Sequence, residues 1–347
     1  MSLTVVLFIS ADCWLCVFDL LTPSQLGLGI AMISHRFDYY VDEHFKTCKW
    51  TLKPIQIWRK IGDNGTKEME IVNSSWKPMP TPQIQLPRKV IGFERITIFF
   101  IDRNAITFLR RFYQLFTDFP INLTIDPYYN DCILEFISRN ILPMLGKNIH
   151  GLELSVDVFR RLRQFVPPIL NDCPSLRVFS ICIADFFTEF PADENAMASD
   201  GQAVAKWLFT PLQSNVPKVF KCALDTTYDR NLASRIEAIK AAFASASSPV
   251  NFIVIIRFIP SSFAFSVLVP FDLTNEMTRE RLALKETKYD DCLLLFVRCP
   301  ITRDESKWTK WEEEAIGWEI YDQWNQIDIH IYRFSTQIPA QVISRQK

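Results

Sequence analysis

Two cysteines in Cys13-Trp-Leu-Cys16 have the spacing used by redox dithiols and by one half of many zinc sites. A zinc site needs further ligands, but the next cysteine along the chain, Cys48, stands alone. A redox dithiol needs a basic setting, whereas Cys16 lies inside an apolar helical pattern. We therefore predict that both thiols have a packing role and that the chain binds no metal.

The nine cysteines are scattered, at positions 13, 16, 48, 132, 173, 182, 222, 292 and 299. Their odd number and apolar surroundings are typical of reduced thiols and favour a cytoplasmic or nuclear location. The alternative is a secreted protein, because residues 3–9 form a short apolar run and Asn64, Asn73 and Asn122 begin glycosylation triplets. No Lys or Arg precedes that run, which disfavours a signal peptide.

The four histidines, His35, His44, His150 and His330, form no paired motif of the kind that binds catalytic zinc. The sequence also contains no local signature of a nucleophile with a neighbouring general base. We predict that the chain is not an enzyme, that it has no catalytic residues and that it needs no cofactor.

Basic residues gather in two small groups, Arg103, Arg110 and Arg111, and then Arg160, Arg161 and Arg163. Both groups fit the solvated outer faces of helices. The net charge is −1, so bulk electrostatics favours neither nucleic acid nor an anionic membrane. No stretch reaches 18 apolar residues, the length that would predict a membrane span. We therefore expect neither nucleic acid nor a membrane as a partner.

The elements that position these residues begin with three short helices over residues 10–48. An apolar stripe at i, i+3, i+4 and i+7 spacing starts at Trp14, and Pro23 ends that helix. The run from Thr22 to Gln25 has the spacing of a capping box and predicts the start of the second helix. Another apolar stripe, from Phe37 onward, predicts the third.

A change of period follows the helices. Alternating apolar residues on both sides of Asp63-Asn64-Gly65 predict a β-hairpin over residues 51–75. Residues 76–88 contain four prolines and predict a stiff, extended linker. We expect a domain boundary there.

Beyond this linker, β-branched runs alternate with amphipathic helical patterns. Strands are predicted near Ile96, Ile121, Gly151 and Leu176 and at Val219–Leu224 and Phe252–Phe258, with helices that include Gly201–Leu212 and Ala233–Phe243. A βα unit of this size cannot bury its faces alone and must stack on its neighbours. Two geometries stay open, a leucine-rich-repeat-like array and an ordinary open α/β sheet.

The last part of the chain differs. Ser266–Thr274, Arg281–Lys285 and Leu293–Val297 predict antiparallel strands, Arg303–Trp318 predicts a helix, and we expect the chain end to fray. The predicted fold class is α+β. Its parts are a helical module at 10–50, a hairpin and proline-rich linker at 51–90, and an α/β repeat-like domain with a C-terminal antiparallel segment at 91–335.

The order of features in residues 12–48 resembles an F-box. That pattern is an acidic residue, an apolar helix ending in a leucine pair, a short polar turn, a leucine-rich second helix and an apolar-Ser-basic-basic-aromatic run. In this chain the features are Asp12, the helix to Leu20-Leu21, Thr22-Pro-Ser24, the stretch from Leu26 to Ile30, and Ile33-Ser-His-Arg-Phe37. The resemblance covers about a tenth of the chain.

Later segments resemble the F-box-associated region of the expanded nematode F-box families, namely Asp42–Trp50, Pro168–Pro174, Pro270–Thr274 and Val297–Asp304. The resemblance implies a substrate-recognition adaptor of an SCF-type ubiquitin ligase. The F-box would bind a Skp-type adaptor and through it a cullin, and the domain at 91–335 would bind a protein target. Apolar helix anchors fill such grooves, so we expect the adaptor-binding residues to be Trp14, Leu15, Phe18, Leu21, Leu26, Leu28 and Ile33.

A second function stays open. The chain is then a non-catalytic α/β-repeat interaction scaffold whose degenerate F-box packs on its own domain. The residues that bind a target are not assigned by the sequence. A concave repeat face presents alternate strand residues, such as Thr97, Asn122, Glu153 and Ser180, as positions for specificity.

Overall fold

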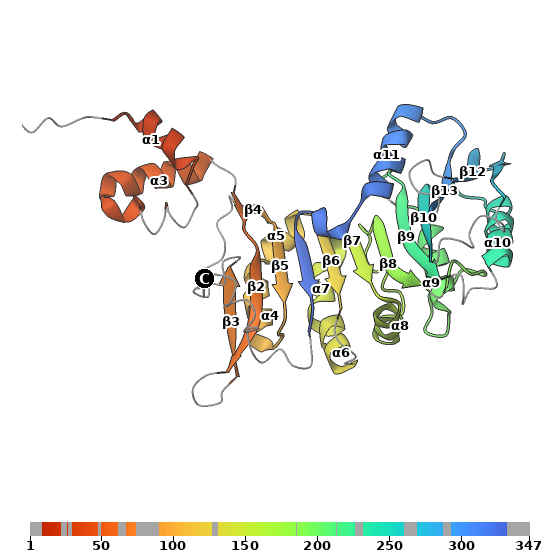
Figure 1. Cartoon of the computed structure of the whole chain (residues 1–347), viewed down its shortest axis with the longest axis horizontal. Coiled ribbons are helices and arrows are strands. Elements are labelled where there is room, and N and C mark those ends of the chain that lie inside the picture. The colour runs from red at the N-terminus through yellow and green to blue at the C-terminus, as the bar shows by residue number, and fades with distance from the viewer. Residues whose placement is uncertain are drawn as a thin grey trace, which may run out of the picture.

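The computed structural model describes residues 9–21, 26, 30–47, 50–61, 67–73, 90–126, 131–184, 186–212, 214–225, 232–259, 269–286 and 293–331. Its main feature is a 12-stranded sheet in the order β11-β12-β13-β10-β9-β8-β7-β6-β14-β5-β2-β3. Figure 1 shows this sheet running from β3 at one end to β12 at the other. The predicted combination of helices with a large mixed sheet is confirmed.

Eight neighbouring strands run parallel and form the body of the sheet. In spatial order they are β2 (Ile55–Ile61), β5 (Arg95–Ile98), β14 (Gln326–Ile329), β6 (Ile121–Ile125), β7 (Ile149–Leu154), β8 (Val178–Ala184), β9 (Lys218–Asp225) and β10 (Phe252–Ile259). Both ends are antiparallel: β3 (Lys67–Asn73) pairs with β2, and β13 (Leu293–Pro300), β12 (Glu280–Glu286) and β11 (Phe271–Asn275) follow β10. The predicted antiparallel pairing near the C-terminus is confirmed.

Helices follow the parallel strands and cover one face of the sheet. They are α4 (Arg103–Arg111), α5 (Tyr113–Asp118), α6 (Asp131–Asn140), α7 (Leu142–Leu145) with the 3₁₀ helix η3 (Gly146–Asn148), α8 (Val156–Phe165), α9 (Asp200–Leu208) and α10 (Leu232–Ala244). Alternate strand residues, such as Ile96, Leu123 and Phe179, contribute to the main core on this face. From β6 to β10 each βα unit adds the next strand in chain order, which is the repeat that the sequence predicts.

The strand β14 was not predicted. It comes near the end of the described chain, after α11 (Glu305–Gly317) and the 3₁₀ helix η5 (Ile320–Asp322), and lies between β5 and β6, parallel to both. Figure 1 shows this blue strand between the orange β5 and the yellow β6. The sequence missed it because four residues, Gln-Ile-Asp-Ile, are too short a run for a period-two pattern to be recognised.

The helix α11 packs on the other face of the sheet from α4–α10. Trp308 and Ala315 of α11 join a second apolar cluster with Val219, Ile253 and Leu295. The strand members of this cluster lie on β8, β9, β10 and β13. In the described part of the chain, no helix packs an apolar stripe onto the same face of β2, β5, β14 and β6.

A small helical unit precedes the sheet. It consists of α1 (Ala11–Phe18), the 3₁₀ helix η2 (Ala31–Ile33) and α3 (His35–Thr47), around a core of Phe18, Leu26 and Val41. Figure 1 places the unit beyond the end of the sheet that carries β2 and β3. Most of the predicted second helix falls outside the described residues, which include only residues 26 and 30–33 of that stretch, so a three-helix module stays a prediction.

The predicted hairpin at 51–75 is part of the large sheet. Its strands are β2 and β3, and β2 also pairs with β5, which joins the hairpin to the parallel body. A separate two-stranded parallel sheet forms from β1 (Trp50–Leu52) and β4 (Val90–Phe93). The turn at Asn64-Gly65 and the proline-rich linker at 76–88 lie outside the described residues.

Candidate functional site

The face of the sheet opposite α4–α10 carries a line of polar side chains, here called the polar row. Strand pairing places its members side by side. In spatial order they are Gln56 on β2, Thr97 on β5, Asp328 on β14, Thr124 on β6, Glu153 on β7, Ser180 on β8 and Lys221 on β9. Parallel sheets are usually apolar on both faces, so a polar row across the middle of this one is a candidate functional feature. Five of its members, Thr97, Asp328, Thr124, Glu153 and Ser180, are buried.

A second row lies two residues earlier along the same strands. It runs from Arg95 through Gln326, Asn122 and Gly151 to Val178 and Val219. The two valines belong to the cluster under α11. This second row therefore changes from polar to apolar at β8, and α11 covers its apolar part.

All four positions that the sequence suggested for specificity lie on this face. Thr97, Glu153 and Ser180 are members of the polar row, and Asn122 belongs to the second row. The structure also brings Asp328 between Thr97 and Thr124, which no sequence pattern indicated, because β14 was not predicted. Target-binding residues stay unassigned, but the suggested positions share one surface.

The segment between α11 and β14 borders the two polar rows. The carbonyl of Tyr321 accepts a hydrogen bond from Arg95 Nη2 at 2.8 Å, and that of Trp324 accepts one from Asn122 Nδ2 at 2.8 Å. Gly151 leaves room for Trp318, because a Cβ atom there would lie 2.8 Å from the indole ring. The side chains of Tyr321 and Trp324 are exposed, so two aromatic groups stand beside the polar rows.

Burial changes the protonation of the acids in the polar row. It raises the pKa of the Glu153 carboxyl, while a hydrogen bond from Ser180 opposes the shift. Burial likewise raises the pKa of Asp328, against the effect of Arg95, whose Nε lies 3.5 Å from the carboxylate. A shift toward the neutral form lets a carboxyl group donate as well as accept hydrogen bonds. In this structure the two carboxyls are buried and bond within the sheet, Glu153 to Ser180 and Asp328 to Gln326.

We expect Glu153→Gln to raise the free energy of unfolding near neutral pH and to change it little in acid. A raised pKa means that the folded chain binds more protons than the unfolded chain between the two pKa values. The contribution of this carboxyl to stability is therefore fully present below its unfolded pKa and is lost as the pH rises through its folded pKa. Glutamine keeps the shape and removes the titration.

Thermal melts of both proteins between about pH 4 and about pH 8 measure this difference. Glu313→Gln is the matched control, because Glu313 is an exposed carboxylate on α11. A pH-dependent difference of the same size in the control variant would contradict the assignment to burial.

The described cysteines do not favour thiolate chemistry. Burial raises the pKa of Cys173 to about 12 and that of Cys182 to about 11, and it also raises the pKa of Cys222. Their thiols stay protonated at neutral pH, whereas the thiolate is the nucleophile. Cys13 and Cys16 are exposed on α1, so the predicted packing role is wrong for these two.

Among the described residues, no group of three or more His, Cys, Asp or Glu side chains is placed to hold a metal ion. No helix in the same part of the chain has the length and apolarity that crossing a bilayer requires.

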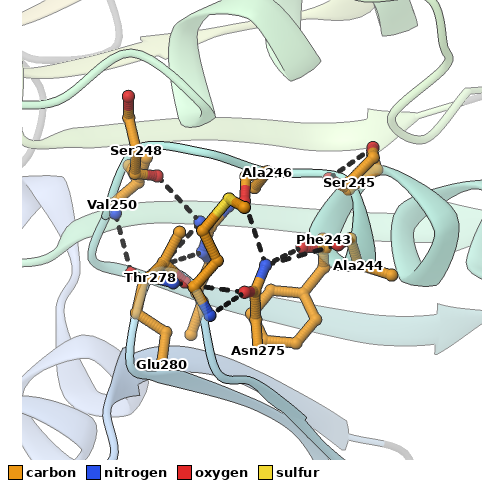
Figure 2. A network of polar contacts seen from close by, with 12 residues as sticks. Phe243, Ala244, Ser245, Ala246, Ser248, Val250, Asn275, Thr278 and Glu280 are labelled. Atoms are coloured by element: carbon orange, nitrogen blue, oxygen red, sulfur yellow. Dashed lines mark hydrogen bonds and ion pairs between the residues drawn. The ribbon is translucent and has the colours of Figure 1, made fainter.

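A second concentration of buried polar groups lies between α10 and the β11–β12 hairpin (Figure 2). The Asn275 amide donates to the carbonyl of Phe243 at 2.8 Å, at the end of α10. The Glu280 carboxylate accepts from the backbone amide of Val250 at 2.7 Å and from Arg298 Nη2 at 2.6 Å. These contacts join groups of this chain to one another, so the network holds the hairpin onto the body of the sheet.

The predicted adaptor-binding residues differ in how far they are exposed on the helical unit. Phe18 and Leu26 are buried in its core, Trp14, Leu15 and Leu21 pack against that core, Ile33 is 62% exposed, and Leu28 lies outside the described residues. The buried residues hold the unit together. Of the residues predicted, Ile33 is thus the one that offers a largely exposed apolar side chain to a partner.

Two exposed apolar residues on and beside α1 were missed. Leu20 is 84% exposed, and Val17 is exposed as well. Leu20 lies off the stripe of Trp14, Phe18 and Leu21, which packs inward, and Val17, which was predicted to belong to that stripe, is exposed instead. Their i, i+3 spacing on a neighbouring stripe is a signal that the sequence contained.

Comparisons of the chain with known protein families, with curated proteins and with solved structures found no match.

Proposed function

We propose that this chain is a substrate-recognition adaptor of an SCF-type ubiquitin ligase. In this proposal the helical unit binds a Skp-type adaptor, which connects to a cullin, and the polar rows of the sheet contact a protein target. The chain catalyses nothing itself. It acts by raising the effective concentration of the target near the ligase.

The observation that carries the proposal is the exposure of apolar side chains on a helical unit that already has its own core. Leu20 and Ile33 are 84% and 62% exposed, while Phe18, Leu26 and Val41 fill the interior. A helix that presents apolar anchors after its own core is filled is suited to a groove on another protein. This arrangement supports a docking role and agrees with the resemblance of residues 12–48 to an F-box.

We expect the double substitution Leu20→Glu and Ile33→Glu to reduce retention of a Skp-type adaptor by at least about tenfold, because charges would enter an apolar groove. Pull-down of the purified adaptor by the full chain measures this. The matched control is Ile183→Glu with Met197→Glu, which places the same two charges at exposed apolar residues of the sheet domain.

Circular dichroism of each variant shows whether the fold is kept. Folded Leu20→Glu, Ile33→Glu protein that retains as much adaptor as the wild type would overturn the proposal. Equal loss in the control pair would show that added charge, and not the helical unit, decides retention.

The target-binding role of the sheet is supported by two exposed aromatic side chains, Tyr321 and Trp324, beside the largely buried polar rows. Polar donors and acceptors lie next to the exposed rings of Tyr321 and Trp324. Aromatic residues are enriched at protein interfaces, and polar side chains provide the directional contacts that select a partner. The identity of the target is left to co-purification.

A second candidate function is an interaction scaffold outside any ubiquitin ligase. It is favoured by one observation, since every member of the polar rows lies between residues 56 and 328 and none belongs to the helical unit. A deletion of residues 1–49 ends just before β1 and distinguishes the two proposed functions. A soluble remainder that melts cooperatively favours the adaptor, whereas loss of solubility favours a helical unit packed on its own domain.

A further inference from the structure

A hollow of about 650 Å³ lies in the helix layer, where the ends of α4 and α6 meet α5 and α7. Its polar lining consists of Arg110, Arg111, Arg139, Gln114, Asn140 and Tyr113. Among the residues that the structure describes, no acidic side chain lines it. The hollow is therefore positively charged, although the chain as a whole has a net charge of −1.

Two of its three arginines have no protein partner. Within the part of the chain that the structure describes, neither Arg110 nor Arg111 forms an ion pair or a side-chain hydrogen bond, and the Arg111 Nη1 atom is buried without an acceptor. Arg139 forms an ion pair with Glu135 at 2.7 Å on its own helix. Buried donors are nearly always satisfied in folded proteins, so the buried Nη1 atom of Arg111 is an exception, whereas Arg110 is exposed to solvent.

The second arginine group of the sequence provides an internal comparison. Arg160 and Arg163 both reach Asp200, at 2.9 and 2.8 Å, and Arg161 reaches Asp131 at 3.2 Å. Those cations are neutralised by acids of the same chain. The same residue type on a similar helix is thus paired in one place and unpaired in the other, and only the unpaired group faces a hollow free of acids.

Helix ends account for part of this arrangement. Arg110 and Arg111 lie in the last turn of α4, where the helix dipole favours cations. The dipole, however, gives no hydrogen-bond acceptor to Nη1 of Arg111. The dipole accounts for one cation at the end of a helix. It does not account for two adjacent arginines that line the same hollow as Arg139.

We propose that this hollow binds a phosphate-class oxyanion. A phosphate monoester carries two negative charges and several acceptor oxygens, which match the planar N–H forks of Arg110 and Arg111. The amides of Gln114 and Asn140 provide further donors. The volume exceeds what a phosphate alone needs, and the exposed Tyr113 ring lies beside it for the group that carries the phosphate. The site stands whether or not the helical unit binds a Skp-type adaptor.

Isothermal titration calorimetry with inorganic phosphate and with O-phosphoserine tests the site on the full chain at constant ionic strength. We expect saturable binding to the wild type and at least about tenfold weaker binding to the Arg110→Gln, Arg111→Gln variant. The matched control is Arg161→Gln with Lys206→Gln, which removes two positive charges from α8 and α9, away from the hollow. Circular dichroism confirms that each variant is folded.

A phosphoserine peptide, compared with its unphosphorylated form, distinguishes the source of the phosphate. Tighter binding of the phosphopeptide than of O-phosphoserine supports a phosphorylated protein as the source. Equal affinity for both supports a small phosphate ester, and either result keeps the site. Binding that does not saturate in the wild type would overturn the proposal, as would equal weakening in the control variant.

Discussion

Replacing Glu280 with alanine is expected to lower the free energy of unfolding by about 3–5 kcal/mol, the cost of breaking a buried ion pair from one side. Glu280 and Arg298 are 1% and 0% exposed, and Arg298 Nη2 lies 2.6 Å from Glu280 Oε2. The other carboxylate oxygen accepts from the amide of Val250 at 2.7 Å. Alanine therefore leaves a buried guanidinium without its countercharge and a buried amide without its acceptor. Urea denaturation followed by circular dichroism measures the change.

The matched control is Asp272→Ala, which breaks the pair between Asp272 and Arg281 at 2.7 Å on the neighbouring strands β11 and β12. Both of those side chains are partly exposed, so the expected loss is about 0–1 kcal/mol. Glu280→Gln keeps an acceptor for the Val250 amide, and we expect a smaller loss than for alanine. Equal losses for Glu280→Ala and Asp272→Ala would contradict the role given to burial.

The large loss of stability expected for Glu280→Ala follows from the other contacts that Arg298 makes. Its guanidinium lies over the rings of Phe209 and Phe243, each 5.2 Å from the ring centroid, and donates to the carbonyl of Ser248 at 3.2 Å. Arg298 belongs to β13, where the sheet changes from parallel to antiparallel. Loss of the pair is thus expected to loosen the antiparallel end of the sheet first, which hydrogen exchange of β11 and β12 measures.

Replacing Ile327 with alanine is expected to lower the free energy of unfolding by about 2–5 kcal/mol, the usual range for a buried isoleucine. Ile327 is almost fully buried and lies in the middle of the sheet, with Ile96 on one side and Leu123 on the other. Truncation leaves a cavity between two strands that the chain brings together only through β14. Chemical denaturation of the two proteins measures the difference.

Ile183→Ala is the control for Ile327→Ala. Ile183 also lies in a strand, β8, but is 60% exposed, so the expected change is within about 0.5 kcal/mol. If both substitutions cost the same, β14 does not contribute to the core as described. A large loss at Ile327 alone supports β14 as the element that completes the sheet.

The repeat was predictable because its units are local. Runs such as those at Ile121 and Val219 alternate with helices whose apolar stripes repeat every three or four residues, and both periods can be read within one unit. Stacking then follows, since such a unit cannot bury its faces alone. The hairpin after residue 51 and the antiparallel strands near the C-terminus were predictable for the same reason.

The candidate surface was predictable only in part. Alternation within a strand separates Thr97, Glu153 and Ser180 from the apolar residues beside them, so these positions could be assigned to one face of the sheet. Their burial on that face could not be predicted. Asp328 could not, because its place between β5 and β6 depends on a strand that is distant in sequence. In the helical unit, the inward stripe was evident, but only packing showed that Leu20 stays outside it.

The sequence by itself determined the helical unit at the N-terminus, the βα alternation and the antiparallel C-terminal strands, because propensity and hydrophobic period act over short distances. The tertiary structure decided where β14 enters the sheet, which carboxylates belong to the polar row, and which arginines form ion pairs with acids of the same chain. Arg110 and Arg160 have similar helical settings in the sequence, yet Arg160 pairs with Asp200, whereas no acid reaches Arg110 within the described residues. Charge pairing between distant segments depends on the packing of whole elements, and no local pattern encodes it.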